Sequence, residues 1–141
     1  MKILTLSFKL FVLLIFLFGC STKEVDNLDI KLLHDIWALE SINGEKIDID
    51  ETVKNLPVLE IYVEDERVRG NTGCNVLNGN VEIDDNRISF SKIITTEMAC
   101  PGNLEQRFLS ALLQVDNYKI EKLRLHLYDD NEDLLTLRKI D

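Results

Sequence analysis

Apolar and polar residues alternate with a period of two along most of the chain after residue 35. Between residues 59 and 64, the apolar positions are separated by Glu60, Tyr62 and Glu64, which is the pattern of a strand with one buried face. Similar extended runs follow, most of them bounded by polar turns, at 67–71, 80–83, 88–90, 93–98, 118–120, 123–128 and 135–137. We predict a mainly β (α+β) fold of seven or eight short strands, in which an antiparallel sheet curls into a barrel or sandwich.

Two further segments complete the predicted domain. Residues 36–42 form the first strand, with Trp37 in the core, because the run ends at Asn43-Gly44, a dipeptide typical of tight turns. The acidic stretch 48–55 is predicted to be a loop. One segment has helical periodicity after Asn103, the expected capping residue, and its apolar stripe comprises Leu104, Phe108, Ala111, Leu112 and Val115. We predict one helix that covers the sheet and contributes this stripe to the core.

The first 20 residues have the composition of a secretory signal. Lys2 and Lys9 supply positive charge, and the apolar run 10–18 is shorter than the about 20 residues that a membrane-spanning helix needs. The run ends at Leu17-Phe18-Gly19-Cys20, which resembles the bacterial lipobox. This resemblance implies a lipoprotein signal peptide at 1–19, lipidation of Cys20, a tether over 20–32 and a globular domain over 33–141. A plain signal peptide and an uncleaved anchor are the alternatives.

The residue after the cysteine bears on location. Ser21 stands where an aspartate is the usual mark for retention in the inner membrane, so the lipoprotein resemblance implies the outer membrane, on its periplasmic or surface side. Lipid chains on Cys20 would hold the protein at the membrane without a spanning segment.

The net charge limits the possible partners. The chain carries a formal charge of −9, with 16 Lys and Arg against 25 Asp and Glu; loss of Lys2 and Lys9 with the signal leaves 14 against 25, or −11. An acidic body repels nucleic acid and anionic lipid head groups. Basic or cationic partners are electrostatically permitted, and solubility alone also explains such a charge. The length after the signal fits a single domain, which we expect to be monomeric.

Two cysteines remain if Cys20 carries lipid. Cys74 and Cys100 form an even pair outside the cytoplasm, where disulfides persist. A bridge between them would stabilise the fold by about 3 to 4 kcal/mol according to the chain-entropy model. Two buried free thiols are the competing interpretation, and metal binding is disfavoured because no histidine is nearby in sequence.

The most distinctive stretch is 70–79, Gly-Asn-Thr-Gly-Cys-Asn-Val-Leu-Asn-Gly. Three glycines and three asparagines in ten residues suit a backbone that visits positive φ, so this is a shaped loop. It contains no nucleophile paired with a base and no set of metal ligands. We expect it to meet the segment 95–101, which holds the second cysteine.

Catalytic groupings are not evident elsewhere. His126 is predicted to be exposed on a strand face opposite Leu125 and Leu127, and His34 precedes the first strand. The acidic run 129–133 is predicted to be a solvated turn, because it lacks the glycine and the distant glutamate of a calcium loop. The cysteine pair is not Cys-X-X-Cys, so a structural bridge is favoured over a redox-active one. We predict no enzyme activity, cofactor or metal.

These motifs together resemble the META domain of HslJ-like lipoproteins. The resemblance covers residues 33–139 and rests on Trp37–Gly44, the Gly-Cys-Asn loop with Gly79, Thr96-Glu97-Met98-Ala99-Cys100-Pro101, and Phe108–Leu112. It implies a β-rich fold with one helix. It also implies an envelope protein linked to tolerance of stress, including heat shock and an antibiotic, and in some parasites to motility and virulence. No catalytic residues are established for that family, so none are carried over.

The leading hypothesis is a membrane-tethered, non-enzymatic binding or stress-protection module. We expect it to engage another envelope protein through the surface around the two loops, with the binding candidates Asn71, Gly73, Asn75, Thr96 and Met98. One alternative is a carrier that holds a small apolar ligand in the mouth of the sheet. The other is a thiol redox protein.

Overall fold

The computed structural model describes residues 27–50 and 55–140 of the chain. The predicted signal peptide, Cys20, most of the tether and the loop residues 51–54 lie outside the described residues. Among the residues described, no helix is long and apolar enough to cross a membrane.

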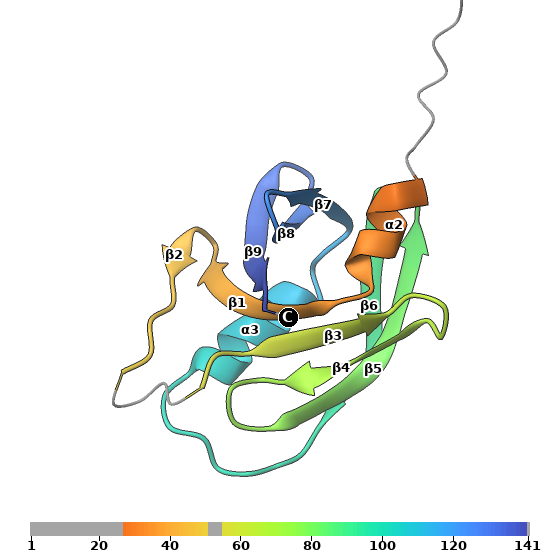
Figure 1. Cartoon of the computed structure of the whole chain (residues 1–141). Helices are drawn as coiled ribbons and strands as arrows, with labels where there is room; N and C mark the ends of the chain where they lie inside the picture. The colour runs from red at the N-terminus through yellow and green to blue at the C-terminus, as the bar shows by residue number, and fades with distance from the viewer. Residues whose placement is uncertain (1–26, 51–54, 141) are drawn as a thin grey trace, which may run out of the picture.

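All nine strands of the described chain belong to one antiparallel sheet, which curls into a ring (Figure 1). They are β1 (Ile36–Ile42), β2 (Glu45–Lys46), β3 (Val58–Tyr62), β4 (Arg67–Asn71), β5 (Val76–Asp84), β6 (Arg87–Thr95), β7 (Asn117–Glu121), β8 (Arg124–Asp129) and β9 (Glu132–Lys139). The order is β2-β1-β3-β4-β5-β6-β7-β8-β9, and β1 also pairs with β9. The predicted curled antiparallel sheet is confirmed.

The ring is uneven around its circumference, so it is not a regular barrel. Strand β5 pairs with β6 along nearly its whole length, whereas β6 meets β7 at the single pair Arg87 and Asn117. Lys92 has φ +50 where the β5 to β6 register shifts, so a bulge bends β6 in its middle. This bulge explains why the sequence pattern indicated two runs, 88–90 and 93–98, where the structure has one strand ending at Thr95.

Helix α3 (Leu104–Leu112) is the predicted covering helix, and it packs against β1 and β9 behind the sheet in Figure 1. Its Phe108, Ala111 and Leu112 are buried, and Val115 is buried just beyond its end. Asn103 occupies the capping position but its side chain makes no cap hydrogen bond, so that part of the prediction was wrong. The helix is held by its apolar face rather than by a cap.

A second short helix, α2 (Asn27–Leu33), lies where the sequence predicted a polar tether. Leu33 is fully buried, and its carbonyl accepts a hydrogen bond of 3.1 Å from Nε1 of Trp37, which is itself in the core. This contact satisfies the one polar atom of the largest buried side chain. The folded part of the chain therefore begins several residues before the predicted boundary at residue 33.

The interior of the ring is filled by side chains from every long strand and both helices. The fully buried members include Leu39, Leu59, Ile61, Val68, Leu77, Val81, Phe108, Leu112, Leu125, Leu127, Leu135 and Leu137. Apart from Phe108 and Leu112 of α3, they are the inward positions of the alternating runs, which is why the period of two predicted the strands. Within the described residues, these side chains occupy the space inside the ring.

Candidate functional site

The loop between β4 and β5 meets the segment after β6, as the sequence predicted. Cys74 and Cys100 form a disulfide with their Cα atoms 6.0 Å apart. This confirms the bridge over the alternatives of free thiols or a metal site. The bridge joins the loop to the chain that leads into α3, so it ties the sheet to its covering helix.

Asn75 organises this junction from a buried position, with 3% of its surface exposed. Its Oδ1 accepts hydrogen bonds of 2.8 Å from the Thr96 hydroxyl and 2.8 Å from the Met98 amide. Two donors at one oxygen fix the orientation of the amide group. The Asn75 side chain therefore holds the segment after β6 in register with the loop.

The other end of the Asn75 amide faces α3. Nδ2 lies 2.9 and 3.1 Å from the two carboxylate oxygens of Glu105, 3.2 Å from the carbonyl oxygen of Met98 and 3.1 Å from Sγ of Cys100. An amide nitrogen has two hydrogens, so these four acceptors share them. The carboxylate is the strongest acceptor of the set, which joins the first turn of α3 to the loop.

The backbone of the loop is closed by a reciprocal pair of bonds. The Thr72 amide donates to the Asn75 carbonyl at 2.8 Å, and the Asn75 amide donates to the Thr72 hydroxyl at 3.0 Å. Oδ1 of Asn71 accepts from the Gly73 amide at 2.9 Å, which is a side-chain turn common for asparagine. We call the disulfide together with Thr72, Asn75, Thr96, Met98 and Glu105 the clamp.

The predicted loop 70–79 is shorter in the structure, because β4 runs to Asn71 and β5 starts at Val76. Two glycines, Gly70 in β4 and Gly73 in the loop, are required by close contacts. A Cβ at Gly70 would lie 1.9 Å from the carbonyl oxygen of Val58 on β3, and one at Gly73 would lie 2.6 Å from that of Asn55. Gly73 also has φ +90, a conformation that other residues rarely adopt. The glycines thus let the loop lie directly against the chain around β3.

The structure brings the five predicted binding residues together but exposes them unequally. Thr96 and Met98 are exposed, Asn71 and Gly73 are half-buried, and Asn75 is buried. Sequence reasoning missed Thr72 and Glu105. Thr72 lies within the 70–79 motif as a small polar residue, whereas nothing in the sequence around Glu105 links it to that loop.

Apolar side chains surround the exposed rim of the clamp. Val76, Ile94 and Met98 have 52%, 68% and 58% of their surface exposed. Val76 exchanges bonds with Thr96, and Ile94 pairs with Asn78, so Val76 and Ile94 are diagonal neighbours on the outer face of β5 and β6. We call Val76, Ile94, Thr96 and Met98 the clamp surface.

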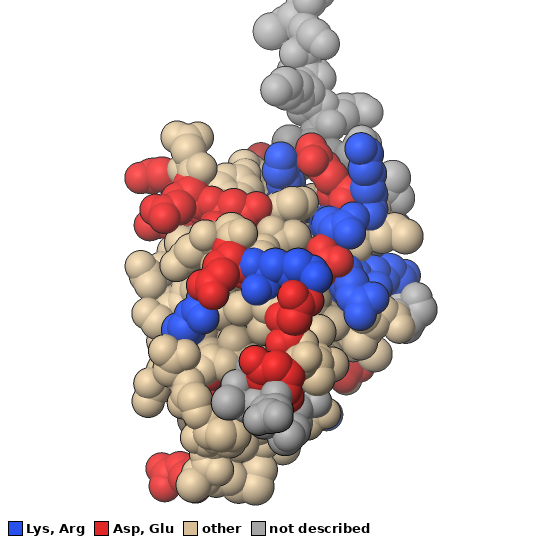
Figure 2. Space-filling model, turned by 90° about the vertical axis from the view of Figure 1, so that its left-hand side faces the viewer, with Lys and Arg blue, Asp and Glu red and all other residues tan. Residues whose placement is uncertain are grey.

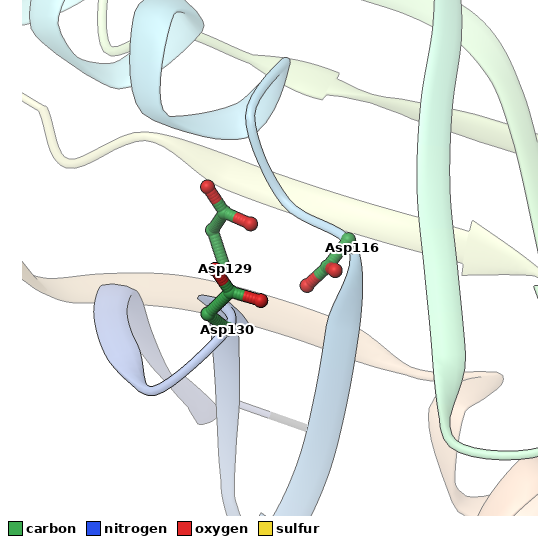
Figure 3. Close-up of side chains that lie close together, drawn as sticks. All are labelled: Asp116, Asp129 and Asp130. Atoms are coloured by element: carbon green, nitrogen blue, oxygen red, sulfur yellow. The ribbon is translucent and has the colours of Figure 1, made fainter.

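Two other predicted features lie elsewhere. His126 is not fully exposed, because Asp133 and Thr136 cover it; its Nδ1 lies 2.9 Å from Oδ2 of Asp133 and 20% of the side chain is exposed. The acidic turn is solvated as predicted. Two of its carboxylates, Asp129 and Asp130, gather with that of Asp116 so that one oxygen from each lies within 4.8 Å of the others (Figure 3).

The fold and the clamp together define a small β-ring domain whose covering helix is fastened to a Gly-Cys-Asn loop. The META domain family matches residues 30–141, and the chain belongs to that family. A comparison with curated proteins finds no match.

Three solved structures share the fold. A protein from Burkholderia xenovorans, solved by NMR, is 23% identical with a TM-score of 0.61, and the match covers 79% of this chain and 86% of that one. A second NMR structure is 21% identical with a TM-score of 0.59, covering 77% and 92%. A crystal structure of a DUF4847 family protein from Bacteroides vulgatus is 14% identical with a TM-score of 0.58, covering 78% and 96%.

Proposed function

We propose that this META-domain protein is a non-enzymatic lipoprotein of the bacterial envelope, anchored through Cys20 in the outer membrane, that supports stress tolerance by binding another envelope component. The observation that carries the binding role is the clamp surface. Three exposed apolar side chains, Val76, Ile94 and Met98, lie around a segment that a disulfide and a buried asparagine hold in one conformation. Exposed apolar groups on a rigid support are typical of interaction sites, because little ordering entropy is lost on binding.

Within the clamp, Asn75 and the disulfide act as supports, whereas the exposed Thr96 and Met98 can make contacts. Asn75 is buried and its side-chain polar atoms already have partners within the chain, so a ligand cannot reach them without opening the loop. The contact residues that we assign are Val76, Thr96 and Met98, with Asn75 positioning them.

The two alternative functions have less support. The interior is packed with side chains, which leaves the carrier hypothesis without an apolar space in the sheet. For a redox protein the cysteines would have to exchange readily. The sulfur of Cys100 instead lies 3.1 Å from Nδ2 of Asn75 within the clamp, which suits a structural bridge.

A photo-crosslinking amino acid at position 98, in intact cells of the native host, tests the binding role. We expect a discrete adduct from position 98 that weakens when Val76 is changed to serine. Position 113 is the matched control, because Leu113 is a comparably exposed apolar residue, at 57%, at the far end of α3. Identical adducts from positions 98 and 113, or none from position 98, would contradict the proposal.

Anchoring and stress tolerance are tested separately. Cys20→Ser should release the protein from the membrane fraction and prevent labelling by a fatty-acid analogue. A strain that carries the double change Val76→Ser and Met98→Ser should lose survival under envelope stress at unchanged protein level. A strain with Leu113→Ser should behave as wild type.

A further inference from the structure

A row of cations without acidic partners lies on the outer face of β4, β5 and β6. Arg67 and Arg69 project from β4, Lys92 comes from the bulge of β6, and all three are exposed. No carboxylate of the described chain lies within 4.0 Å of any of them. In a protein with a formal charge of −9, three exposed cations that form no ion pair within the described residues are unusual.

The cations border a shallow hollow of about 330 Å³ whose lining is part polar and part apolar. Asn78 and Asn80 on β5 pair with Arg69 and Arg67 across the strands, and all four residues line the hollow together with Lys92 and Ile94. Amide side chains offer both donors and acceptors, which suits hydroxyl groups. Guanidinium groups suit the paired oxygens of carboxylates, sulfates and phosphates.

The spacing favours a ligand with several separated charges. Arg67 and Arg69 are two residues apart on one strand face, about 7 Å, and Lys92 is two strands away, about 10 Å. Backbone positions at these separations can present their charges to anionic groups spaced along a chain of sugars. Ile94, 68% exposed at the edge of the hollow, offers an apolar contact to a sugar ring.

Arg69 is held in place by its neighbours. Its guanidinium lies 5.7 Å from the centre of the Tyr62 ring, a distance at which a cation is attracted to the ring face. Glu60, the cross-strand neighbour of Arg69, raises the pKa of the Tyr62 hydroxyl. The ring contact leaves the N–H donors of Arg69 available for a ligand.

We propose that this groove, formed by Arg67, Arg69, Asn78, Asn80 and Lys92, binds an anionic glycan. The acidic body disfavours the two other polyanions that a cell offers. Duplex nucleic acid carries a charge about every 1.7 Å, so the acidic remainder of the protein would repel it. A flat anionic membrane would be repelled in the same way. A flexible chain with a charge on every sugar or two reaches the groove with less repulsion.

The inference does not rest on the proposed role of the clamp surface or on lipidation, because the charged and amide side chains that carry it are not part of the clamp surface; the two sites share Ile94 alone. Glu66, Glu82 and Asp84 line a second hollow beyond Asn80. They limit the groove at that end, so we expect it to hold a short segment of the glycan.

The test is binding of fluorescently labelled octagalacturonate to the full-length protein in a neutral detergent, with neutral maltooctaose as the ligand control. Wild type should bind the acidic glycan, with affinity falling as salt is raised, and should not bind maltooctaose. Arg67→Gln with Arg69→Gln should lower the affinity at least about tenfold.

A second double variant keeps the result interpretable. Lys122→Gln with Arg138→Gln also removes two positive charges, but from exposed positions outside the groove. This variant should bind octagalacturonate within about twofold of wild type. The proposal is overturned by equal losses in the two double variants or by no binding to wild type. Equal binding of octaglutamate or of phosphatidylglycerol vesicles would assign the groove to acidic peptides or membranes instead.

Discussion

Two groups of polar residues on neighbouring stretches of β4 to β6 are used in opposite ways. In the clamp, each side-chain polar atom of Asn75 has a partner within the chain, and the residue is buried. In the groove, which begins three residues farther along the chain at Asn78, Arg67, Arg69 and Lys92 are exposed and have no carboxylate partner in the described structure. The first arrangement stabilises the fold, and the second keeps charge available for something outside it.

The face shown in Figure 2, on the side of β2, gives a third arrangement for comparison. Basic and acidic side chains are interleaved there. The β2 residues take part in this pattern, since Lys46 lies 2.6 Å from Asp48 and Glu45 lies 2.5 Å from Arg107 of α3. Exposed pairs of this kind contribute roughly 0 to 1 kcal/mol each, but they neutralise the surface. The unmatched cations of the groove therefore differ from the usual surface of this protein.

The largest expected effect comes from Asn75→Ala. The change leaves the Thr96 hydroxyl, the Met98 amide and the Glu105 carboxylate without their partner, so we expect a loss of about 3 to 5 kcal/mol in the free energy of unfolding. Denaturant unfolding with the disulfide intact measures it. Asn78→Ala is the matched control, an exposed asparagine of the same strand that should change stability by less than about 0.5 kcal/mol. Similar values for the two variants would remove the distinction between clamp and groove.

A slightly smaller effect is expected from removal of the disulfide. The bridge closes a separation of 26 residues, so Cys74→Ala with Cys100→Ala should cost about 3.5 kcal/mol by the chain-entropy model. Because Asn75 holds the same two segments, the double cysteine variant should remain folded, with an unchanged far-ultraviolet circular dichroism spectrum. Combining it with Asn75→Ala should lower stability by an amount that differs from the sum, since the two parts share one loop. Strict additivity would show that they act independently.

The strands could be predicted from the sequence because each buries one face, so the alternation of Leu59 and Ile61 with Glu60 and Tyr62 appears directly in the pattern. The pairing of β1 with β9 could not, since it joins the two ends of the domain and leaves no local signal. The two-residue strand β2 is too short to show a period. Helix α2 spans only seven residues, too few to show a clear helical period, and Leu33 at its end contacts Trp37 of the first strand.

The candidate site was predicted in its location but not in its internal roles. The two cysteines and the glycine-rich loop indicate from the sequence that the loop and the segment 95–101 lie together, and the structure confirms that they meet. Asn75 is a polar residue of the kind that binds ligands, and only its contacts in the folded structure show that it is buried. The groove was missed because its cations come from two strands that are not adjacent in the sheet, and their proximity depends on the register with β5.

The smallest effect, and the one that sharpens the comparison most, is expected from Glu60→Gln. Glu60 is the acidic residue directly across from Arg69, so its neutralisation should leave the fold unchanged and raise the affinity for octagalacturonate by about threefold.

The same variant has an internal readout at Tyr62, whose pKa is raised chiefly by its hydrogen bond to Glu60. The folded state thus holds the Tyr62 proton more tightly than the unfolded state does. This contribution to stability is fully present below the ordinary tyrosine pKa and is lost as pH rises through the raised pKa of Tyr62. In Glu60→Gln the pKa of Tyr62 should fall toward its ordinary value in an ultraviolet titration, with Tyr62→Phe identifying the signal. A lower pKa of Tyr62 without tighter binding of octagalacturonate would show that Glu60 acts on Tyr62 alone. The charge of Glu60 would then not limit the affinity of the groove for its ligand.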